Sequence, residues 1–241
     1  MLRDKIALNS VASFITVNFL KFKIMKKLIV ICLFCSSIMV SAQVQFKKGP
    51  SGFADFLKDK TVYPGYSKQN CIQGTVSVSF KLDQHGNVYS SKITKGIISD
   101  LDDEALRLIR ISSGKWQVPA GYDTTISVIV PVNFRLTGFN CEGKSKSEIQ
   151  AAILAYKAEE GLTDAVINFY KNIGQAKPGQ EVQILAIKKQ LGIDDEYLSE
   201  VIGSGLKKIK QGDRQGACED FNFVKNMGSK KADEYLVKYC K

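Results

Sequence analysis

The stretch Ile72-Gln-Gly-Thr-Val-Ser-Val-Ser-Phe-Lys-Leu82 alternates apolar and polar side chains with a period of two. This period places the apolar set on a buried face and the polar set in water, as in a half-covered antiparallel strand. Asp83 to Asn87 follows, and Gly86 within it can take a positive φ, so the chain is expected to turn back. Residues 88 to 94 are then predicted to form the second strand of a hairpin.

A helix is predicted next. Asp100 is expected to cap it, and the acidic residues 102 to 104 favour the positive end of the helix dipole. Gly114 lies just past its expected end. The apolar residues that share one helical stripe are Leu101, Ala105, Leu108 and Ile109.

The alternation resumes after this helix, from Ile126 to Leu136, and predicts a further strand. Trp116, the only tryptophan, lies in the return loop and is expected to plug one end of the core. The predicted fold class is therefore α+β, with a small antiparallel sheet in the order ββαβ and helix cover on one face.

Pro131 lies inside the last predicted strand, on its polar parity. Proline has no N–H to donate to a neighbouring strand, so this strand is predicted to be an edge of the sheet. An edge strand can accept an extra strand from a partner, or from a second copy of the same chain, so a homodimer is one possible outcome.

Six spaced motifs within residues 53 to 138 resemble the TonB C-terminal domain family. They are Tyr63-Pro64, Gly74-Thr-Val-Ser-Val-Ser-Phe80, Asp83-x-x-Gly86-x-Val88, Leu101-Asp-x-Glu-Ala-Leu106, Trp116-x-x-Pro119-Ala120 and Val130-Pro-Val-x-Phe134.

The resemblance implies a periplasmic domain that binds TonB-dependent outer-membrane transporters, in which the last strand pairs with a short transporter segment. It also implies which residues contact the partner. These are Tyr63, Pro64, Thr125, Ser127, Ile129, Pro131, Asn133 and Arg135.

TonB energy transducers usually carry an uncleaved membrane anchor and a long Pro-rich linker. This sequence has only five prolines, so no such linker is expected. The expectation is the binding end of a transport machine without its drive end.

The N-terminal region predicts export. Residues 25–42 have a basic start, an apolar run and Val40-Ser41-Ala42 as a cleavage site, which is the form of a secretory signal peptide. The run from Leu28 to Ala42 is shorter than the roughly 20 residues that span a bilayer, so no stable membrane span is expected after cleavage. Residues 1–24 are interpreted as a spurious extension of the gene start. A retained segment that anchors the protein in the inner membrane is the alternative.

The formal net charge of +10 includes this N-terminal region. Residues 1–42 hold six Lys or Arg and one Asp, so the remaining chain has 28 basic and 23 acidic residues, a net charge of +5. The lysines are scattered and no basic stripe alternates with aromatic residues. Nucleic-acid binding is therefore not expected.

Four cysteines follow the predicted cleavage site and allow three pairings. An exported chain is expected to form disulfides. Cys71 begins the first strand and Cys141 follows the last, so these ends meet if the strands are antiparallel neighbours, and a Cys71–Cys141 disulfide is predicted. Cys218 and Cys240 are predicted to staple the terminal helices. A metal site is not expected, because the chain has no CxxC motif and only one histidine.

The predicted domains are residues 43–141, of TonB C-terminal type, and 142–241, entirely helical. Ser145-Lys-Ser-Glu148 is a capping box that opens a first helix, expected to end at Gly161. Later helices are predicted over residues 163–173, 181–191, 194–210 and from Ser229. One tetratricopeptide-like helix pair is indicated by the spacing of Gly205, Gly212, Ala217 and Phe221. The small residues are expected to let the two helices approach, and Phe221 to fill the gap between them.

No spacing of nucleophile and base predicts catalysis, so the protein is not expected to be an enzyme or to need a cofactor. Two functions remain. The first is a periplasmic protein-binding module of TonB type, implicated in TonB-dependent transport. The alternative is an envelope scaffold or adaptor that binds a partner through its helical domain and has no energy-transducing role. An accessible strand edge favours the first, and a large apolar groove on the helical domain favours the second.

Overall fold

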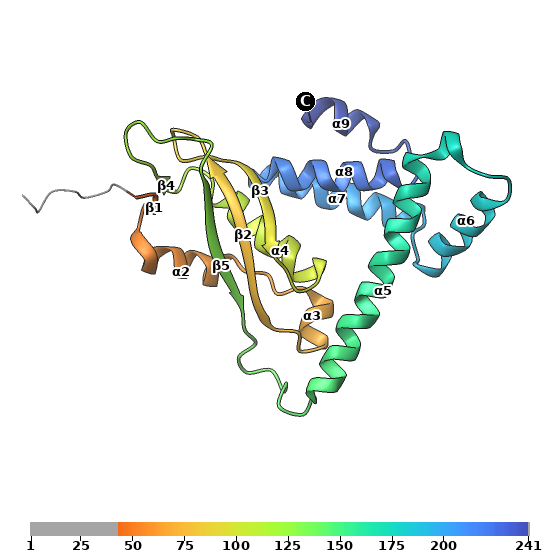
Figure 1. Ribbon diagram of the computed structural model, residues 1–241, viewed down its shortest axis with the longest axis horizontal. Helices are drawn as coiled ribbons and strands as arrows, with labels where there is room; N and C mark the ends of the chain where they lie inside the picture. The colour runs from red at the N-terminus through yellow and green to blue at the C-terminus, as the bar shows by residue number, and fades with distance from the viewer. Residues whose placement is uncertain (1–42, 241) are drawn as a thin grey trace, which may run out of the picture. The chain divides into compact units, whose positions relative to one another are not determined.

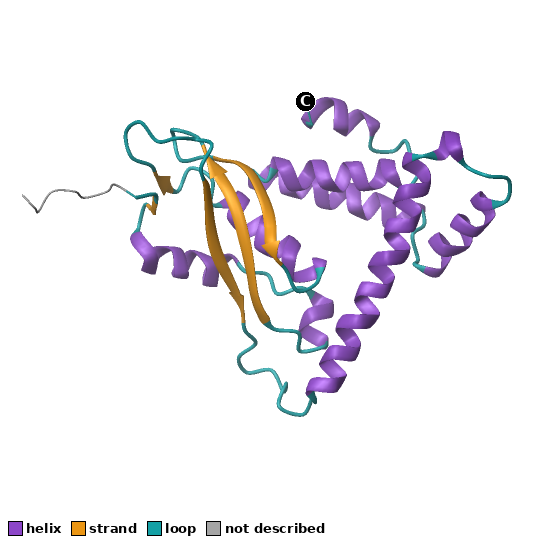
Figure 2. Cartoon of the chain, in the orientation of Figure 1, coloured by secondary structure: helices purple, strands orange, loops and turns teal. Residues whose placement is uncertain are grey.

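The computed structural model describes residues 43–240, and the predicted signal peptide and N-terminal extension lie outside this range. From Gln43 onward the chain forms one compact unit with two hydrophobic cores. The first half is α+β and the second half is helical (Figures 1 and 2). Both features of the predicted fold class are confirmed.

A three-stranded antiparallel sheet forms the centre of the first half, in the order β3-β2-β5. Its strands are β2 (Gly74–Leu82), β3 (Val88–Lys95) and β5 (Ser127–Phe134). The apolar parity of β2 is buried as predicted, since Ile72, Val76, Val78, Phe80 and Leu82 are at most 1% exposed. These five side chains belong to the first hydrophobic core, together with apolar side chains of the helices.

Helix α4 (Ser99–Ile111) packs against β2 and β3, and its predicted stripe is fully buried. The predicted cap was wrong, because Ile98 is the N-cap and makes no side-chain cap bond. Asp100 instead lies in the first turn, where Oδ2 accepts a hydrogen bond from the Ser67 N–H at 2.9 Å. Asp102 Oδ1 accepts from the Ile97 N–H at 3.0 Å, so two carboxylates hold loops against the helix start.

The segment before the sheet is mostly helical. Helix α2 (Gly49–Lys60) has 12 residues, and α3 (Gly65–Gln69) follows it. A short strand β1 (Gln45–Phe46) pairs with β4 (Trp116–Gln117). Trp116 closes one end of the core as predicted, with its ring centroid 4.9 Å from Phe80 and 5.4 Å from Phe46.

Both predicted disulfides are present. Cys71–Cys141 joins the start of β2 to the segment after β5, and Cys218–Cys240 joins the last two helices. In both bridges the Cα atoms are 5.6 Å apart, a normal separation for a disulfide.

The helical half begins with α5 (Lys146–Lys171), capped by the predicted Ser145–Glu148 box. Gly161 does not end this helix, so the two helices predicted on either side of it are one. The half continues with η1 (Ile173–Gln175), α6 (Gln180–Gln190), α7 (Asp195–Gln211), α8 (Arg214–Asn226) and α9 (Asp233–Tyr239). The last helix was predicted to start at Ser229, but it starts at Asp233, with Ala232 as its N-cap.

Helix α5 contributes to both cores. Its first half places Ile149, Ala152, Ile153 and Tyr156 on the first core, while Val166 is buried in the second. Helices α7 and α8 pack against each other at the contact predicted between Gly205 and Phe221. Within the described residues no helix is both long and apolar enough to cross a membrane.

Candidate functional site: an open sheet edge

Strand β5 is an edge of the sheet, as Pro131 predicted. Its ladder to β2 runs without interruption from Gly74↔Phe134 to Lys81↔Ser127, with Pro131 opposite Ser77. No other described strand pairs with the far side of β5. Figure 1 shows β5 at the margin of the sheet, with β2 between it and β3. The backbone groups on that margin are therefore the candidate site.

The geometry of the whole sheet fixes which backbone groups of β5 face outward. On β3, the N–H and C=O of Ser91 bond to the Gln215 side chain and so point away from β2. Ser91 lies opposite Phe80 on β2, and the two residues form a pair that is not joined by backbone hydrogen bonds. The N–H and C=O of Phe80 therefore point to the other side of β2, toward Val128 on β5.

Val128 thus faces β2, and backbone groups of successive residues point to opposite sides of a strand. The odd-numbered residues of β5 therefore direct their N–H and C=O groups to the open side. Pro131 agrees with this phase, because a proline is tolerated where its missing N–H would face away from the ladder. The edge therefore offers three donors, the N–H groups of Ser127, Ile129 and Asn133. It also offers four acceptors, the carbonyls of those residues and of Pro131.

The side chains of the same residues are exposed. The exposed residues along β5 and at its two ends are Thr125, Ser127, Ile129, Pro131, Asn133 and Arg135. The Ile129 side chain is 63% exposed, and that of Ile126, just before the strand, is 53% exposed. The face thus combines free backbone groups with apolar surface, which suits an added strand.

Some of the predicted contact residues already have partners within the protein. Thr125 donates both its N–H, at 2.9 Å, and its hydroxyl, at 2.7 Å, to Asp123 Oδ1. These bonds hold the pKa of the Asp123 carboxyl below its usual value. Thr75 donates its hydroxyl to Asn133 Oδ1 at 2.5 Å, leaving the outward backbone of Asn133 unaffected.

Tyr63 and Pro64 have structural roles in this fold. The Tyr63 hydroxyl donates to the Ile72 carbonyl at 2.6 Å, and its ring meets Phe134 edge-on with centroids 5.8 Å apart. Burial, with a smaller contribution from the Asp100 charge, raises the pKa of Tyr63 to about 12. Pro64 is the N-cap of α3. The pair therefore supports the end of β5 and offers little free polar surface.

A hollow of about 810 Å³ lies between α4, α5, α7 and α8, and no sequence motif predicts it. Asp103 lines it together with two basic residues that are already paired, Arg110 with Glu219 and Lys208 with Asp220. The Asp103 side chain is exposed to the solvent in the hollow, and crowding by the surrounding protein still desolvates its carboxyl enough to raise the pKa to about 6. The described residues contain no cluster of histidine, cysteine or carboxylate side chains that could hold a metal ion.

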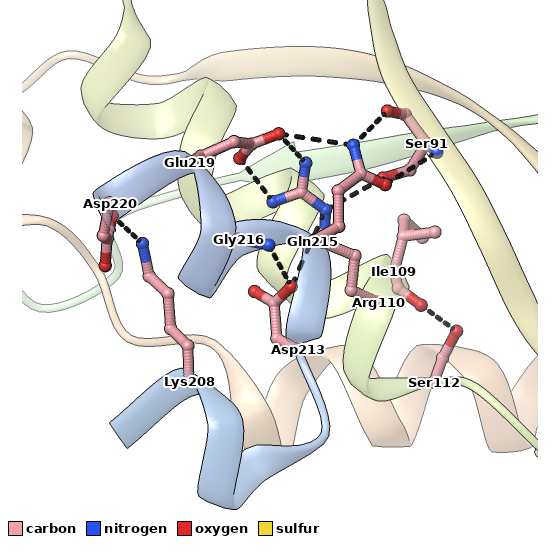
Figure 3. Close-up of polar contacts among 10 residues, drawn as sticks. All are labelled: Ser91, Ile109, Arg110, Ser112, Lys208, Asp213, Gln215, Gly216, Glu219 and Asp220. Atoms are coloured by element: carbon pink, nitrogen blue, oxygen red, sulfur yellow. Dashed lines mark hydrogen bonds and ion pairs between the residues drawn. The ribbon is translucent and has the colours of Figure 1, made fainter. Parts of the chain in front are cut away.

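The polar cluster around Arg110 was also missed by sequence reasoning (Figure 3). Arg110 looked like one more polar residue on an amphipathic helix, yet its side chain is only 6% exposed. Its partners Ser91 and Glu219 lie 19 residues before and 109 residues after it in the chain. The only local signal was an arginine so close to the buried stripe of α4.

Residues 59–136 match the family model described as Gram-negative bacterial TonB protein C-terminal. This segment, which holds all three strands of the sheet, is a domain of that family, and a helical region follows it. No curated protein and no solved structure matches the chain. At the level of the family, the match supports a protein-interaction domain with a TonB-like role in envelope transport.

Proposed function

We propose that this protein is a periplasmic binding module of TonB type, which pairs the β5 edge with a short segment of a TonB-dependent outer-membrane transporter. The observation that carries the proposal is the open edge itself, with outward N–H groups at Ser127, Ile129 and Asn133. Backbone pairing supplies the affinity in this mode of recognition, while neighbouring side chains select the sequence. The family match supports the class of partner.

The proposal includes export and oxidation. A disulfide that joins the start of β2 to the segment after β5 holds the two ends of this strand pair together. Closing a loop of this length restricts the unfolded chain and stabilises the fold by roughly 4 kcal/mol. Such a bond persists in an oxidising compartment such as the periplasm. The domain acts by binding, and no catalytic role is proposed.

The test is capture from a solubilised outer-membrane extract, with the oxidised unit of residues 43–241 as bait. Ile129→Pro removes one outward N–H without removing a bond to β2, as the natural Pro131 already does two residues later. Ile129→Ala is the matched control, because it keeps the N–H and removes the side chain. The proposal predicts that TonB-dependent transporters bind the parent and the alanine variant, and are reduced about fivefold or more on the proline variant.

Two other results would assign the site differently. The scaffold alternative has one observation in its favour, because Val182 and Leu185 on α6 are 71% and 52% exposed. If Val182→Ser with Leu185→Ser abolishes capture and Ile129→Pro does not, the helical half is the binding surface. If Ile129→Pro only abolishes self-association in sedimentation, β5 pairs with a second copy of the chain.

A further inference from the structure

The sheet has a second edge, β3, and a side chain of the helical half covers its middle. The side-chain amide of Gln215 on α8 forms hydrogen bonds with both the N–H and the C=O of Ser91 (Figure 3). Its Oε1 accepts from the Ser91 N–H at 3.2 Å and from the Ser91 hydroxyl at 3.1 Å. Its Nε2 donates to the Ser91 carbonyl at 3.0 Å.

This arrangement imitates a neighbouring strand. A primary amide carries one acceptor and two donors, so it can satisfy an outward N–H and the outward C=O of the same residue at once. Those are the two bonds that a strand added to β3 would make with Ser91. Unpaired edges of this kind invite pairing with other chains, and folded proteins commonly cover them.

The Gln215 amide is held in place by charged groups. Its Nε2 also donates to Glu219 Oε1 at 3.2 Å. Glu219 accepts two hydrogen bonds from the Arg110 guanidinium, at 2.8 and 2.7 Å. Arg110 Nε in turn donates to the Ser91 hydroxyl at 2.9 Å, which closes a ring through β3, α4 and α8.

The start of α8 is fixed by its own cap. Asp213 Oδ1 accepts from the Gly216 N–H at 2.7 Å, and this aspartate is only 1% exposed. The cap sets the direction in which α8 approaches the sheet, two residues before Gln215. The contact to Ser91 is thus supported on both sides, by a buried cap and by a bidentate ion pair.

We propose that the helical half determines which edge of the sheet takes a partner strand, by occupying the Ser91 backbone with Gln215. Strand addition is then confined to β5, and copies of the protein cannot join β3 of one to β5 of the next. A head-to-tail contact of that kind does not close on itself and would build open chains. The part that concerns a transporter strand rests on the proposed function, whereas the cover over β3 does not.

The first arm of the test needs no partner. Amide hydrogen exchange by NMR is compared among the parent, Gln215→Ala and a matched control, Gln183→Ala, which makes the same change at an exposed position of α6. We expect the Ser91 amide to exchange about fivefold faster in Gln215→Ala alone. The Lys92 amide points into the ladder and should stay protected in all three proteins, which shows that the sheet remains folded. Equal exchange of Ser91 in all three proteins would overturn the proposal.

The second arm follows self-association by sedimentation velocity over a range of concentrations. Gln215→Ala is expected to form larger species at high concentration than the parent and Gln183→Ala. Adding Ile129→Pro to Gln215→Ala should reverse this, because the β5 edge then loses one donor. If Gln215→Ala sediments like the parent at every concentration, Gln215 does not guard the edge. Neither arm uses transporter capture, so the two proposals can fail separately.

Discussion

Gly205 on α7 faces the ring of Phe221 on α8 with no room for a side chain. A Cβ atom at Gly205 would lie 2.5 Å from Phe221 Cε1, and Phe221 is fully buried. The ring also stacks on Tyr235 at a centroid distance of 5.3 Å, so it has little freedom to move. The spacing of these two residues predicted the contact, while the tetratricopeptide-like character of the unit remains a prediction.

We expect Gly205→Ala to destabilise the protein by about 1–3 kcal/mol, since the new methyl group overpacks the α7–α8 contact. Gly203→Ala is the control on the same helix, where nothing lies within 4 Å of the new Cβ. That change should stabilise by up to about 1 kcal/mol, because alanine favours the helix. Urea unfolding of the oxidised proteins measures both values, and destabilisation of equal size at the two positions would contradict the packing.

Asp103 predicts a pH dependence with a definite sign. Desolvation is the main cause that raises the pKa of this carboxyl in the folded protein to about 6. The charge of Lys208 opposes this rise, and the charge of Glu219 adds to it. In the unfolded chain the pKa lies near 4. The folded state therefore binds the proton more tightly, and this group's contribution to stability falls as pH rises from about 4 to about 6.

We expect Asp103→Asn to be more stable than the parent above pH 6, and equal to it below pH 4. Because the Asp103 side chain is exposed, water screens its charge, and the gain should be at most about 1 kcal/mol. Thermal unfolding from pH 4 to 8 measures this gain in stability. The control is Asp55→Asn, at an exposed position of α2. A difference from the parent that does not vary with pH would show that the carboxyl charge is not the cause.

At the scale of elements, α5 shows where a local rule failed. Glycine is common just past helix ends, so Gly161 was predicted to end the first helix of the second half. A helix end of that type needs a positive φ, which Gly192 has at +66° and Gly161 does not. The helix continues because its two ends bury side chains in different cores, and this burial outweighs the roughly 1 kcal/mol that a helical glycine costs.

The two glycines should therefore respond oppositely to alanine. Gly161→Ala is expected to stabilise by about 0.5–1 kcal/mol, because its Cβ meets nothing within 4 Å and the backbone is helical. Gly192→Ala is expected to destabilise by about 1–2 kcal/mol, because alanine resists the left-handed backbone. Denaturant unfolding distinguishes the signs, and loss of stability in Gly161→Ala would indicate a break in α5.

At the scale of the whole molecule, the sequence predicted one sheet edge and missed the cover on the other. Pro131 marks β5 as an edge by itself, because a missing N–H is a property of one residue. The two disulfides followed from where strands and helices begin and end. The cover on β3 joins residues 124 positions apart, and a glutamine on a helix surface carries no local sign of its partner.

Partner binding at the β5 edge can be tested by amide hydrogen exchange on a complex. The probe is the periplasm-facing segment of the transporter recovered by capture, added to the oxidised protein. We expect the outward amides of Ser127, Ile129 and Asn133 to become protected on binding, while exchange of the Ser91 amide is unchanged. Protection that appears on α6 or at Ser91, with none at those three amides, would contradict it.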